Sequence, residues 1–210
     1  MTTLEQILTH KIVAIIRGAN PADVLQIANA LYQSGIRCIE ITLNSPDALN
    51  VIESISMKME GRILAGAGTV LNPTAARNAI AAGAKFIISP ITDTETIRIT
   101  KHLGAVSIPG AFTPTEIYKA FSAGGDIIKV FPGTSGPGFI KEMLGPLPHI
   151  PLMPTGGITL ANIHEFKKAG AVAFGIGKSL VDTKKKVNDD TLQEIIANGR
   201  GFMQAVNNIV

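Results

Sequence analysis

Short apolar runs alternate with longer amphipathic stretches along the whole chain. The eight apolar runs, each given with its first residue, are KIVAIIR (Lys11), CIEITL (Cys38), ILAGAGTV (Ile63), KFIISP (Lys85), AVSIPGA (Ala105), DIIKVFP (Asp126), IPLMPTG (Ile150) and AVAFGIG (Ala171). Between them, stretches such as ADVLQIANALYQSG and TAARNAIAAGA carry apolar residues at helical spacing. This alternation predicts repeated βα units around a parallel sheet.

Glycine and proline mark the expected ends of the helices. Four helical stretches close on a glycine that can adopt the left-handed conformation, at Gly35, Gly83, Gly124 and Gly170. At the opposite ends, four stretches are expected to begin where an N-cap residue precedes a proline, at Asn20-Pro21, Ser45-Pro46, Asn72-Pro73 and Thr113-Pro114. The predicted units therefore have consistent boundaries.

The number of units favours a closed barrel over an open sheet. Eight βα units in 210 residues are near the lower size limit of a (β/α)8 TIM barrel, whereas open doubly wound sheets have fewer strands and often a Gly-x-Gly-x-x-Gly first turn. The first turn here, RGANPAD, lacks that motif. We therefore predict one α/β barrel domain over residues 1–210, with an N-terminal helix at 2–9 and a closing helix at 190–208.

Composition narrows the class of protein. Hydrophobic residues make up 46% of the chain and charged residues 17%, which suits one substantial core. The single cysteine, Cys38, allows no disulfide framework, so we expect an intracellular, cytoplasmic location. The opening MTTLEQILTH does not resemble a signal peptide, and no apolar run approaches the ~20 residues of a membrane span. We expect a protein that binds no membrane.

The charge distribution and the histidine spacing do not favour binding of nucleic acid or of a metal ion. The net charge of +3 is spread along the chain and aromatic residues make up 5%, which does not favour nucleic-acid binding but suits a small anionic substrate. The four histidines, His10, His102, His149 and His164, have no ligand spacing, so we expect surface histidines and no metal site.

Two charged residues interrupt the apolar strands. Side chains of a barrel strand alternate between the interior and the helix layer. In CIEITL, the apolar Ile39 and Ile41 suit the helix layer, which turns Glu40 inward. In DIIKVFP, the same argument turns Lys129 inward, together with Ile127 and Phe131. Because active sites lie at the carboxyl ends of barrel strands, Arg17, Thr69 and Thr155 are expected to converge on the same mouth.

A buried lysine beside a buried carboxylate suits amine catalysis. Burial lowers the pKa of a lysine, and the free amine attacks ketones to form a Schiff base. A carboxylate within reach can move the protons for dehydration and carbon–carbon cleavage. The alternative is that Lys129 and Glu40 form a structural ion pair, since buried charges are normally paired.

Glycine-rich turns follow the last two predicted strands. PTGGIT (from Pro154) and GIGKS (from Gly175) stand where such barrels commonly bind phosphate through backbone N–H groups and helix N-termini. The candidate residues are Gly156, Gly157, Gly177 and Ser179. Alternatively, these glycines only permit tight βα turns.

Several short motifs, taken together, resemble one enzyme family over nearly the whole chain. The motifs are EITL (Glu40), GAGTV (Gly66), ISP (Ile88), IPG (Ile108), TPTE (Thr113), KVFP (Lys129) and PTGGI (Pro154). Their order and spacing are similar to those of the 2-keto-3-deoxy-6-phosphogluconate (KDPG) and 4-hydroxy-2-oxoglutarate (KHG) aldolases. The resemblance implies a homotrimeric class I aldolase without metal or other cofactor, which cleaves KDPG to pyruvate and glyceraldehyde 3-phosphate, and also KHG to pyruvate and glyoxylate.

The resemblance also implies roles for individual residues. Lys129 corresponds to the Schiff-base lysine and Glu40 to the general acid and base. Thr69 and Pro90 correspond to the pocket for the pyruvate carboxylate, and Thr155 stands beside the reacting carbons. The residues that correspond to the phosphate site are Gly156, Gly157 and Ser179.

One departure leaves the substrate open. Many family members have an arginine directly after the E-x-T-L motif, where this chain has Asn44. Arg17 resembles an arginine of other members and is expected to supply the missing charge. Alternative hypotheses are an aldolase for the galactonate epimer of KDPG, a non-catalytic phosphosugar-binding barrel, and an isomerase or decarboxylase that forms no covalent adduct.

Overall fold

Each predicted apolar run forms a parallel strand in the computed structural model, which describes residues 1–207. The strands are β1 (Ile12–Ile16), β2 (Cys38–Thr42), β3 (Leu64–Gly68), β4 (Phe86–Ile88), β5 (Val106–Ile108), β6 (Gly110–Ala111), β7 (Ile128–Val130), β8 (Leu152–Pro154) and β9 (Phe174–Ile176). β5 and β6 come from one predicted run, which is interrupted at Pro109 because proline has no N–H group for the ladder.

Helices follow the strands in the expected alternation. They are α1 (Thr3–His10), α2 (Pro21–Gln33), α3 (Ala48–Lys58), α4 (Pro73–Ala81), α5 (Thr94–His102), α6 (Pro114–Ser122), the 3-10 helix η1 (Gly133–Ser135), α7 (Pro137–Leu144), α8 (Ile163–Lys168) and α9 (Asp189–Asn207). The leading and closing helices are confirmed, except that the last predicted helical residue, Asn208, lies outside the described residues.

Most of the predicted helix boundaries are confirmed. Asn20, Asn72 and Thr113 each accept a hydrogen bond from a backbone N–H group of the first helical turn. The prediction at Ser45 was wrong, because the helix starts two residues later, with Asp47 at the N-cap and Ala48 as its first residue. The Ser45 hydroxyl instead accepts from the N–H group of Gly18 at 2.8 Å, so it joins the turn after β2 to the turn after β1.

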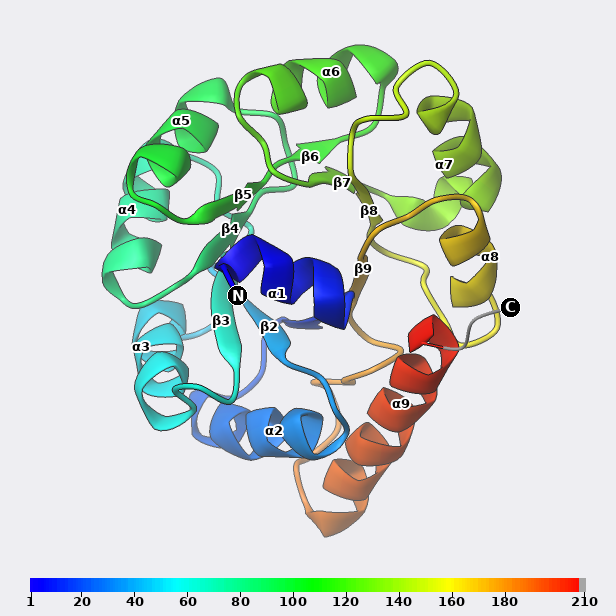
Figure 1. Cartoon of the computed structure of the whole chain (residues 1–210). Helices are drawn as coiled ribbons and strands as arrows, with labels where there is room; N and C mark the ends of the chain where they lie inside the picture. Colours follow the sequence, from blue (N-terminus) through cyan, green and yellow to red (C-terminus); the bar gives the residue numbers. More distant parts are fainter. Residues whose placement is uncertain (208–210) are drawn as a thin grey trace.

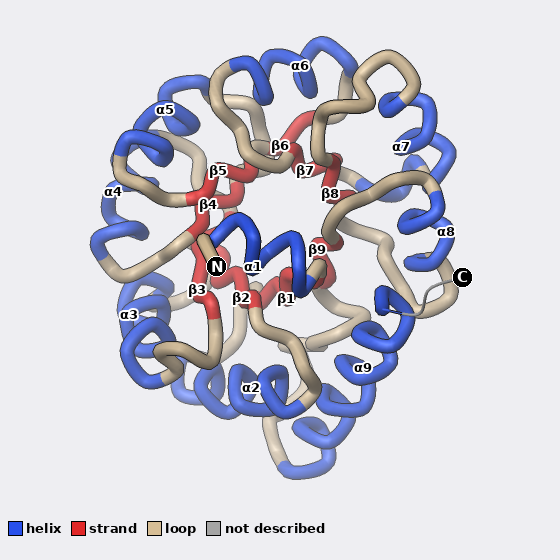
Figure 2. Tube along the Cα trace, viewed as in Figure 1, coloured by secondary structure: helices blue, strands red, loops and turns tan. Residues whose placement is uncertain are grey.

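The strands form a curled parallel sheet with helices on its outer side (Figures 1 and 2). Six strands are ordered β5-β4-β3-β2-β1-β9 and three are ordered β6-β7-β8. The two groups are continuous through Pro109 on one side, and a parallel bridge between Thr155 and Gly175 connects them on the other. Helix α1 lies across the end of the sheet at which the strands begin (Figure 1).

Two apolar clusters divide the core as the strand pattern predicts. The outer cluster, between strands and helices, contains Ile39, Ile41, Ile128 and Val130. The inner cluster, enclosed by the curled sheet, contains Cys38 and Ile127 together with Ile7 of α1. Burial raises the pKa of the Cys38 thiol to about 12, which keeps it protonated and inert. Among residues 1–207, no helix is long and apolar enough to cross a membrane.

Candidate active site

Lys129 lies in the middle of β7 and points into the enclosed centre of the sheet. Its neighbours Ile128 and Val130 face the helices, so the alternation of the strand directs the amine inward. The side chain is only 3% exposed, and Nζ lies 5.1 Å from the centre of the Phe131 ring. Burial lowers the pKa of Lys129, partly opposed by the negative charge of Glu40 and assisted by the positive charge of Arg17. A larger fraction of the reactive free amine follows at neutral pH.

Glu40, in the middle of β2, is fully buried. Gly68 of the neighbouring strand makes room for it, because a Cβ atom at Gly68 would stand 1.6 Å from Glu40 Oε1. Neither carboxylate oxygen accepts a hydrogen bond from the described residues. Burial raises the pKa of Glu40, while the charges of Lys129 and Arg17 lower it in part. A buried carboxyl without hydrogen bonds is costly to stability and is therefore typical of a functional group.

The two buried groups influence each other without forming an ion pair. Each shifts the pKa of the other, which places them within electrostatic reach. Within residues 1–207, however, the salt bridges join Arg98 to Glu95, Lys101 to Asp126 and Lys185 to Glu194. This arrangement does not favour the structural ion-pair alternative, in which direct contact would stabilise both charges.

Arg17 follows β1 and brings a positive charge to the carboxyl ends of the strands. Its Nη2 donates to Thr69 Oγ1 at 3.3 Å, and its backbone carbonyl accepts from the Thr183 hydroxyl at 2.6 Å. Thr69 has a φ of 55°, in the left-handed region that is uncommon for a residue other than glycine. Such strained positions cluster at functional sites, so Thr69 is a candidate for a constrained role there.

A cavity of about 570 Å³ joins most of the predicted site residues, and its size suits a small-molecule ligand. The predicted residues that line it are Arg17, Lys129, Thr155, Gly156, Gly157, Gly177 and Ser179. Thr155 is buried in the bridge to β9, where Gly175 leaves room for it: a Cβ at Gly175 would lie 2.4 Å from Thr155 Oγ1.

The glycine turns beside this cavity present free backbone donors. The N–H groups of Gly157, Lys178 and Ser179 donate to no acceptor among the described residues. Successive free N–H groups form a concave anion site. The expected continuation into helix N-termini is only partly present, because α8 begins six residues after Gly157 and is short. An anion would therefore meet the turn itself rather than the end of a long helix.

Three predicted residues lie outside the lining of this cavity. Glu40 is buried and does not line the cavity. Thr69 contacts Arg17, which does line it, and Pro90 follows β4 at the same carboxyl end of the sheet. Pro90 packs closely against β6, since a Cβ at Gly110 would stand 2.4 Å from the Pro90 carbonyl carbon. The structure thus places Pro90 beside β6 but not among the lining residues.

Sequence reasoning missed some cavity residues. Ile15, Phe131, Ile158, Thr159, Gly175 and Lys178 also line it. Phe131 carried a usable signal, because the alternation of its strand turned it inward beside Lys129, and it is 40% exposed at the mouth. Lys178 lies between the predicted residues Gly177 and Ser179. Its side chain is exposed and interrupts no apolar strand, so nothing in the sequence distinguished it from an ordinary surface lysine.

The histidines do not form a metal site in the described part of the chain, where no group of three or more His, Cys, Asp or Glu side chains is placed to bind an ion. His102 and His149 are exposed as expected, whereas His10 and His164 are half-buried. His149 packs edge-on against Phe121, with ring centres 5.5 Å apart.

A buried lysine and a buried carboxyl inside a parallel sheet suit a lyase that acts through an amine. The chain belongs to the KDPG and KHG aldolase family, whose family model matches residues 4–197. It is therefore an aldolase, a carbon–carbon lyase.

Individual relatives agree with this assignment. The chain is 34% identical to the probable 2-dehydro-3-deoxy-6-phosphogalactonate aldolase of Rhizobium meliloti, over 82% of each chain. It is 34% identical to the 2-dehydro-3-deoxy-phosphogluconate aldolase of Pseudomonas aeruginosa, over 74% of this chain and 71% of that one. The crystal structure of a KDPG aldolase from Legionella pneumophila, with pyruvate captured as a covalent carbinolamine, is similar with a TM-score of 0.81. The two chains are 26% identical, and the match covers 98% of this chain and 97% of the other.

Proposed function

We propose that this chain is a class I aldolase that cleaves 2-keto-3-deoxy-6-phosphogluconate to pyruvate and glyceraldehyde 3-phosphate. The observation that carries the proposal is the position of Lys129, whose buried amine opens onto a cavity beside free backbone donors and Arg17. The carbinolamine captured in the relative from Legionella pneumophila supports the same chemistry here.

In the proposed reaction, the neutral Lys129 amine attacks the ketone carbon of the substrate. The carbinolamine that forms loses water to give an imine, with Glu40 giving a proton to the departing hydroxyl. The protonated imine accepts the electron pair of the breaking carbon–carbon bond while Glu40 removes the proton of the neighbouring hydroxyl, which releases the aldehyde. The remaining enamine takes up a proton, and water hydrolyses it to pyruvate and free lysine.

The other site residues are proposed to bind the substrate. Arg17 and Thr69 orient an anionic group near the mouth, with Pro90 bounding the carboxylate pocket. Thr155 lies beside the reacting carbons. The turns at Gly156, Gly157, Gly177 and Ser179 accept the phosphate through backbone N–H groups. No metal or other cofactor takes part in this scheme.

We also infer that the curled sheet is a closed (β/α)8 barrel and that residues 1–210 form a single domain. The bridge between Thr155 and Gly175 and the continuity of the chain through Pro109 support closure. The family resemblance supports a cytoplasmic homotrimer.

A second candidate substrate is the galactonate epimer, which the relative from Rhizobium meliloti favours. KHG, which yields glyoxylate, is a third. Asn44 is exposed on the turn after β2, where a bulky anion-binding arginine is absent. The choice between epimers therefore depends on how Arg17 replaces that charge.

The test is to measure kcat/KM for both epimers and for KHG with the purified protein, in the presence and absence of EDTA. The proposal predicts the highest kcat/KM with the gluconate substrate and no effect of EDTA. A higher kcat/KM with the galactonate epimer would identify that epimer as the substrate. Absence of cleavage of all three by folded protein would favour the phosphosugar-binding alternative.

A further inference from the structure

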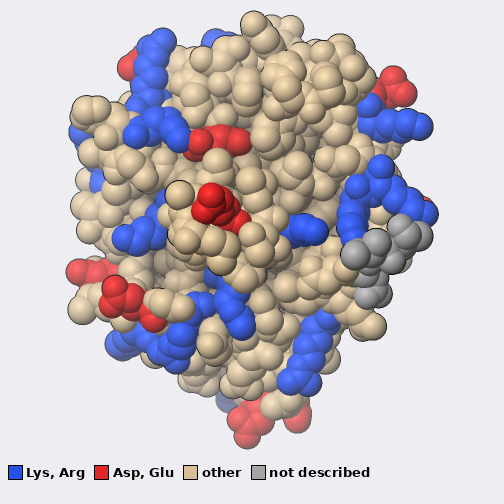
Figure 3. Space-filling view, viewed as in Figure 1, with Lys and Arg blue, Asp and Glu red and all other residues tan. Residues whose placement is uncertain are grey.

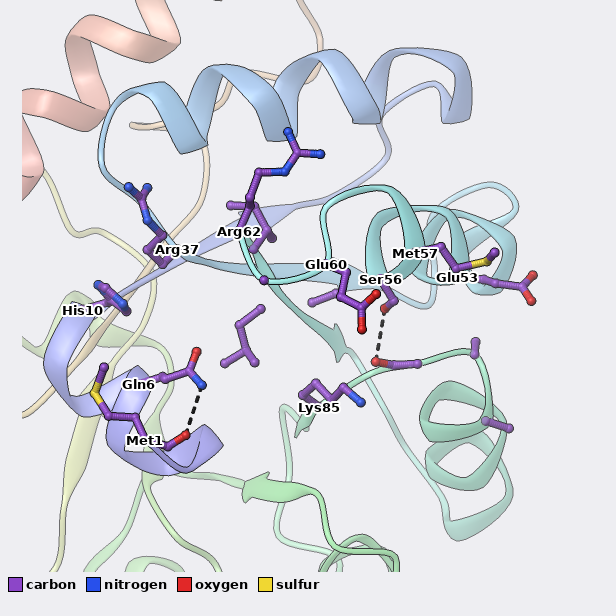
Figure 4. Close-up of a pocket in the computed structure, with 17 residues that line it drawn as sticks. Met1, Gln6, His10, Arg37, Glu53, Ser56, Met57, Glu60, Arg62 and Lys85 are labelled. Carbon is purple, nitrogen blue, oxygen red and sulfur yellow. Dashed lines mark hydrogen bonds between the residues drawn. The ribbon is translucent and has the colours of Figure 1, made fainter.

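Figure 4 shows a second cavity, of about 660 Å³, at the end at which the strands begin. It is lined by residues that precede strands rather than follow them: His10 before β1, Arg37 before β2 and Lys85 before β4. Because all the paired strands are parallel, a ligand here cannot overlap the cavity at their carboxyl ends.

Arg37 gives this cavity a fixed positive charge. Its Nη1 donates to the carbonyl oxygens of Tyr32 at 2.8 Å and Ile36 at 2.9 Å, and its guanidinium carbon lies 4.2 Å from the centre of the Tyr32 ring. The side chain is half-buried, and no carboxylate of the described residues forms a salt bridge with it. The guanidinium therefore has donors in place without a neutralising partner.

His10 stands beside Arg37 at the same end of the cavity (Figure 4). It is half-buried at the carboxyl end of α1. Burial, and then the charge of Arg37, lower the pKa of His10. An anion bound between them would offset this repulsion and accept charge-assisted hydrogen bonds from both.

The rest of the lining sets the polarity of the cavity. Arg62 and Lys85 add positive charge from the loops before β3 and β4, and the same face of the molecule carries several basic side chains (Figure 3). The acidic Glu53 lies at the far end from Arg37, with Glu60 between them (Figure 4). A bound anion would therefore place its charged group at the Arg37 end and its uncharged part toward Glu60.

We propose that this second cavity binds a small organic anion, through a carboxylate or phosphate group held between Arg37 and His10. Its volume is in the range of small-molecule sites. The binding should weaken with ionic strength, since Lys85 is exposed and screened. The inference does not depend on which substrate the carboxyl-end cavity takes.

The test uses the intact protein with citrate and inorganic pyrophosphate as separate probes for the two anion chemistries. Binding is measured by calorimetry, and the site is located by the NMR signals of the His10 imidazole. Tighter binding of one probe identifies the group recognised. We expect Arg37→Gln to weaken binding of that probe roughly tenfold, because it removes a charged donor, and Lys85→Gln to weaken it by a smaller factor.

Two arginine variants serve as controls. Arg77→Gln changes an exposed arginine of α4 that does not line the second cavity, and Arg17→Ala removes one of the cations of the other cavity; neither should alter the response of the His10 signals to the probe. If Arg37→Gln does not fold, because Tyr32 loses its partner, Lys85→Gln and His10→Gln provide the test. The proposal fails if millimolar probe leaves the His10 signals unchanged, or if Arg17→Ala abolishes the binding.

Discussion

Lys129 and Glu40 share a buried environment in which the charge of each depends on the other. Burial disfavours both charges, lowering the pKa of Lys129 and raising that of Glu40. The negative charge of Glu40 in turn raises the pKa of Lys129, which limits how far the pKa of the amine falls. Burial thus brings the two pKa values closer together, which favours the proton transfers of the proposed general acid and base.

The first prediction concerns the pH dependence of imine formation. The rate of reductive trapping with pyruvate should rise with pH, because protonated lysine cannot attack, and its inflection should lie below the ordinary lysine value of 10.5. Glu40→Gln should move the inflection to still lower pH, since it removes a charge that raises the pKa of Lys129, and should slow cleavage roughly 10²- to 10⁴-fold. Rapid-quench trapping over a pH series measures the inflection, and steady-state kinetics with the cleavable substrate measures the turnover.

The control for this experiment is Glu165→Gln, which removes an exposed carboxylate of α8. It should leave the inflection and the turnover unchanged. If the inflection is unchanged in Glu40→Gln, the Glu40 charge does not affect the pKa of Lys129. That result would contradict the proposed role of the carboxyl.

The second prediction concerns Arg17. Arg17→Ala should raise the KM for phosphorylated substrate more than it lowers kcat, since it removes a contact to a non-reacting group. Arg77→Ala, a change at an exposed arginine outside both cavities, should leave both constants unchanged. Steady-state kinetics measures both constants. A KM unaffected by Arg17→Ala would contradict the binding role of Arg17 and would indicate that the glycine turns bind this group instead.

At the scale of the elements, small residues in the strands leave space for functional ones. Gly68 of β3 accommodates the Glu40 carboxylate, and Gly175 of β9 accommodates the Thr155 hydroxyl. In the same way, Gly66 accommodates Phe86, whose ring would lie 2.2 Å from a Cβ atom there. The glycines of β3 thus leave room for larger interior side chains, including Glu40.

The third prediction tests that role. Gly68→Ala should displace the Glu40 carboxylate, lower the free energy of unfolding by about 1–3 kcal/mol and reduce turnover, since the added methyl overpacks the interior. Gly138→Ala, in α7, meets no atom within 4 Å and should make the protein up to about 1 kcal/mol more stable without affecting turnover. Urea denaturation and steady-state rates measure both. A Gly68→Ala protein as stable and active as the parent would contradict the placement of Glu40.

The sequence pattern predicted these elements well because burial depends on the alternation of side chains along a strand. Ile39 and Ile41 lie on the helix side of β2, and their position in the sequence was sufficient to predict that Glu40 points inward. The boundary at Ser45 was mispredicted for a physical reason: its hydroxyl hydrogen-bonds to Gly18, a contact 27 residues away that local propensity does not contain.

At the scale of the whole molecule, the parallel strands separate two polar ends. Lys129, Arg17 and the glycine turns gather at the carboxyl ends, while Arg37, His10 and Lys85 gather at the amino ends. The first group could be predicted from sequence, because each member departs from the pattern of its strand or turn. The second could not, since it forms only when α1 docks across the sheet and brings His10 next to Arg37.

The central claim is that Lys129 forms a Schiff base, and the most direct measurement is borohydride trapping with pyruvate followed by peptide mass spectrometry. The account predicts a reduced adduct at Lys129 alone, and none at any lysine in a folded Lys129→Ala variant. An adduct at another lysine, or no adduct on folded and active protein, would contradict it.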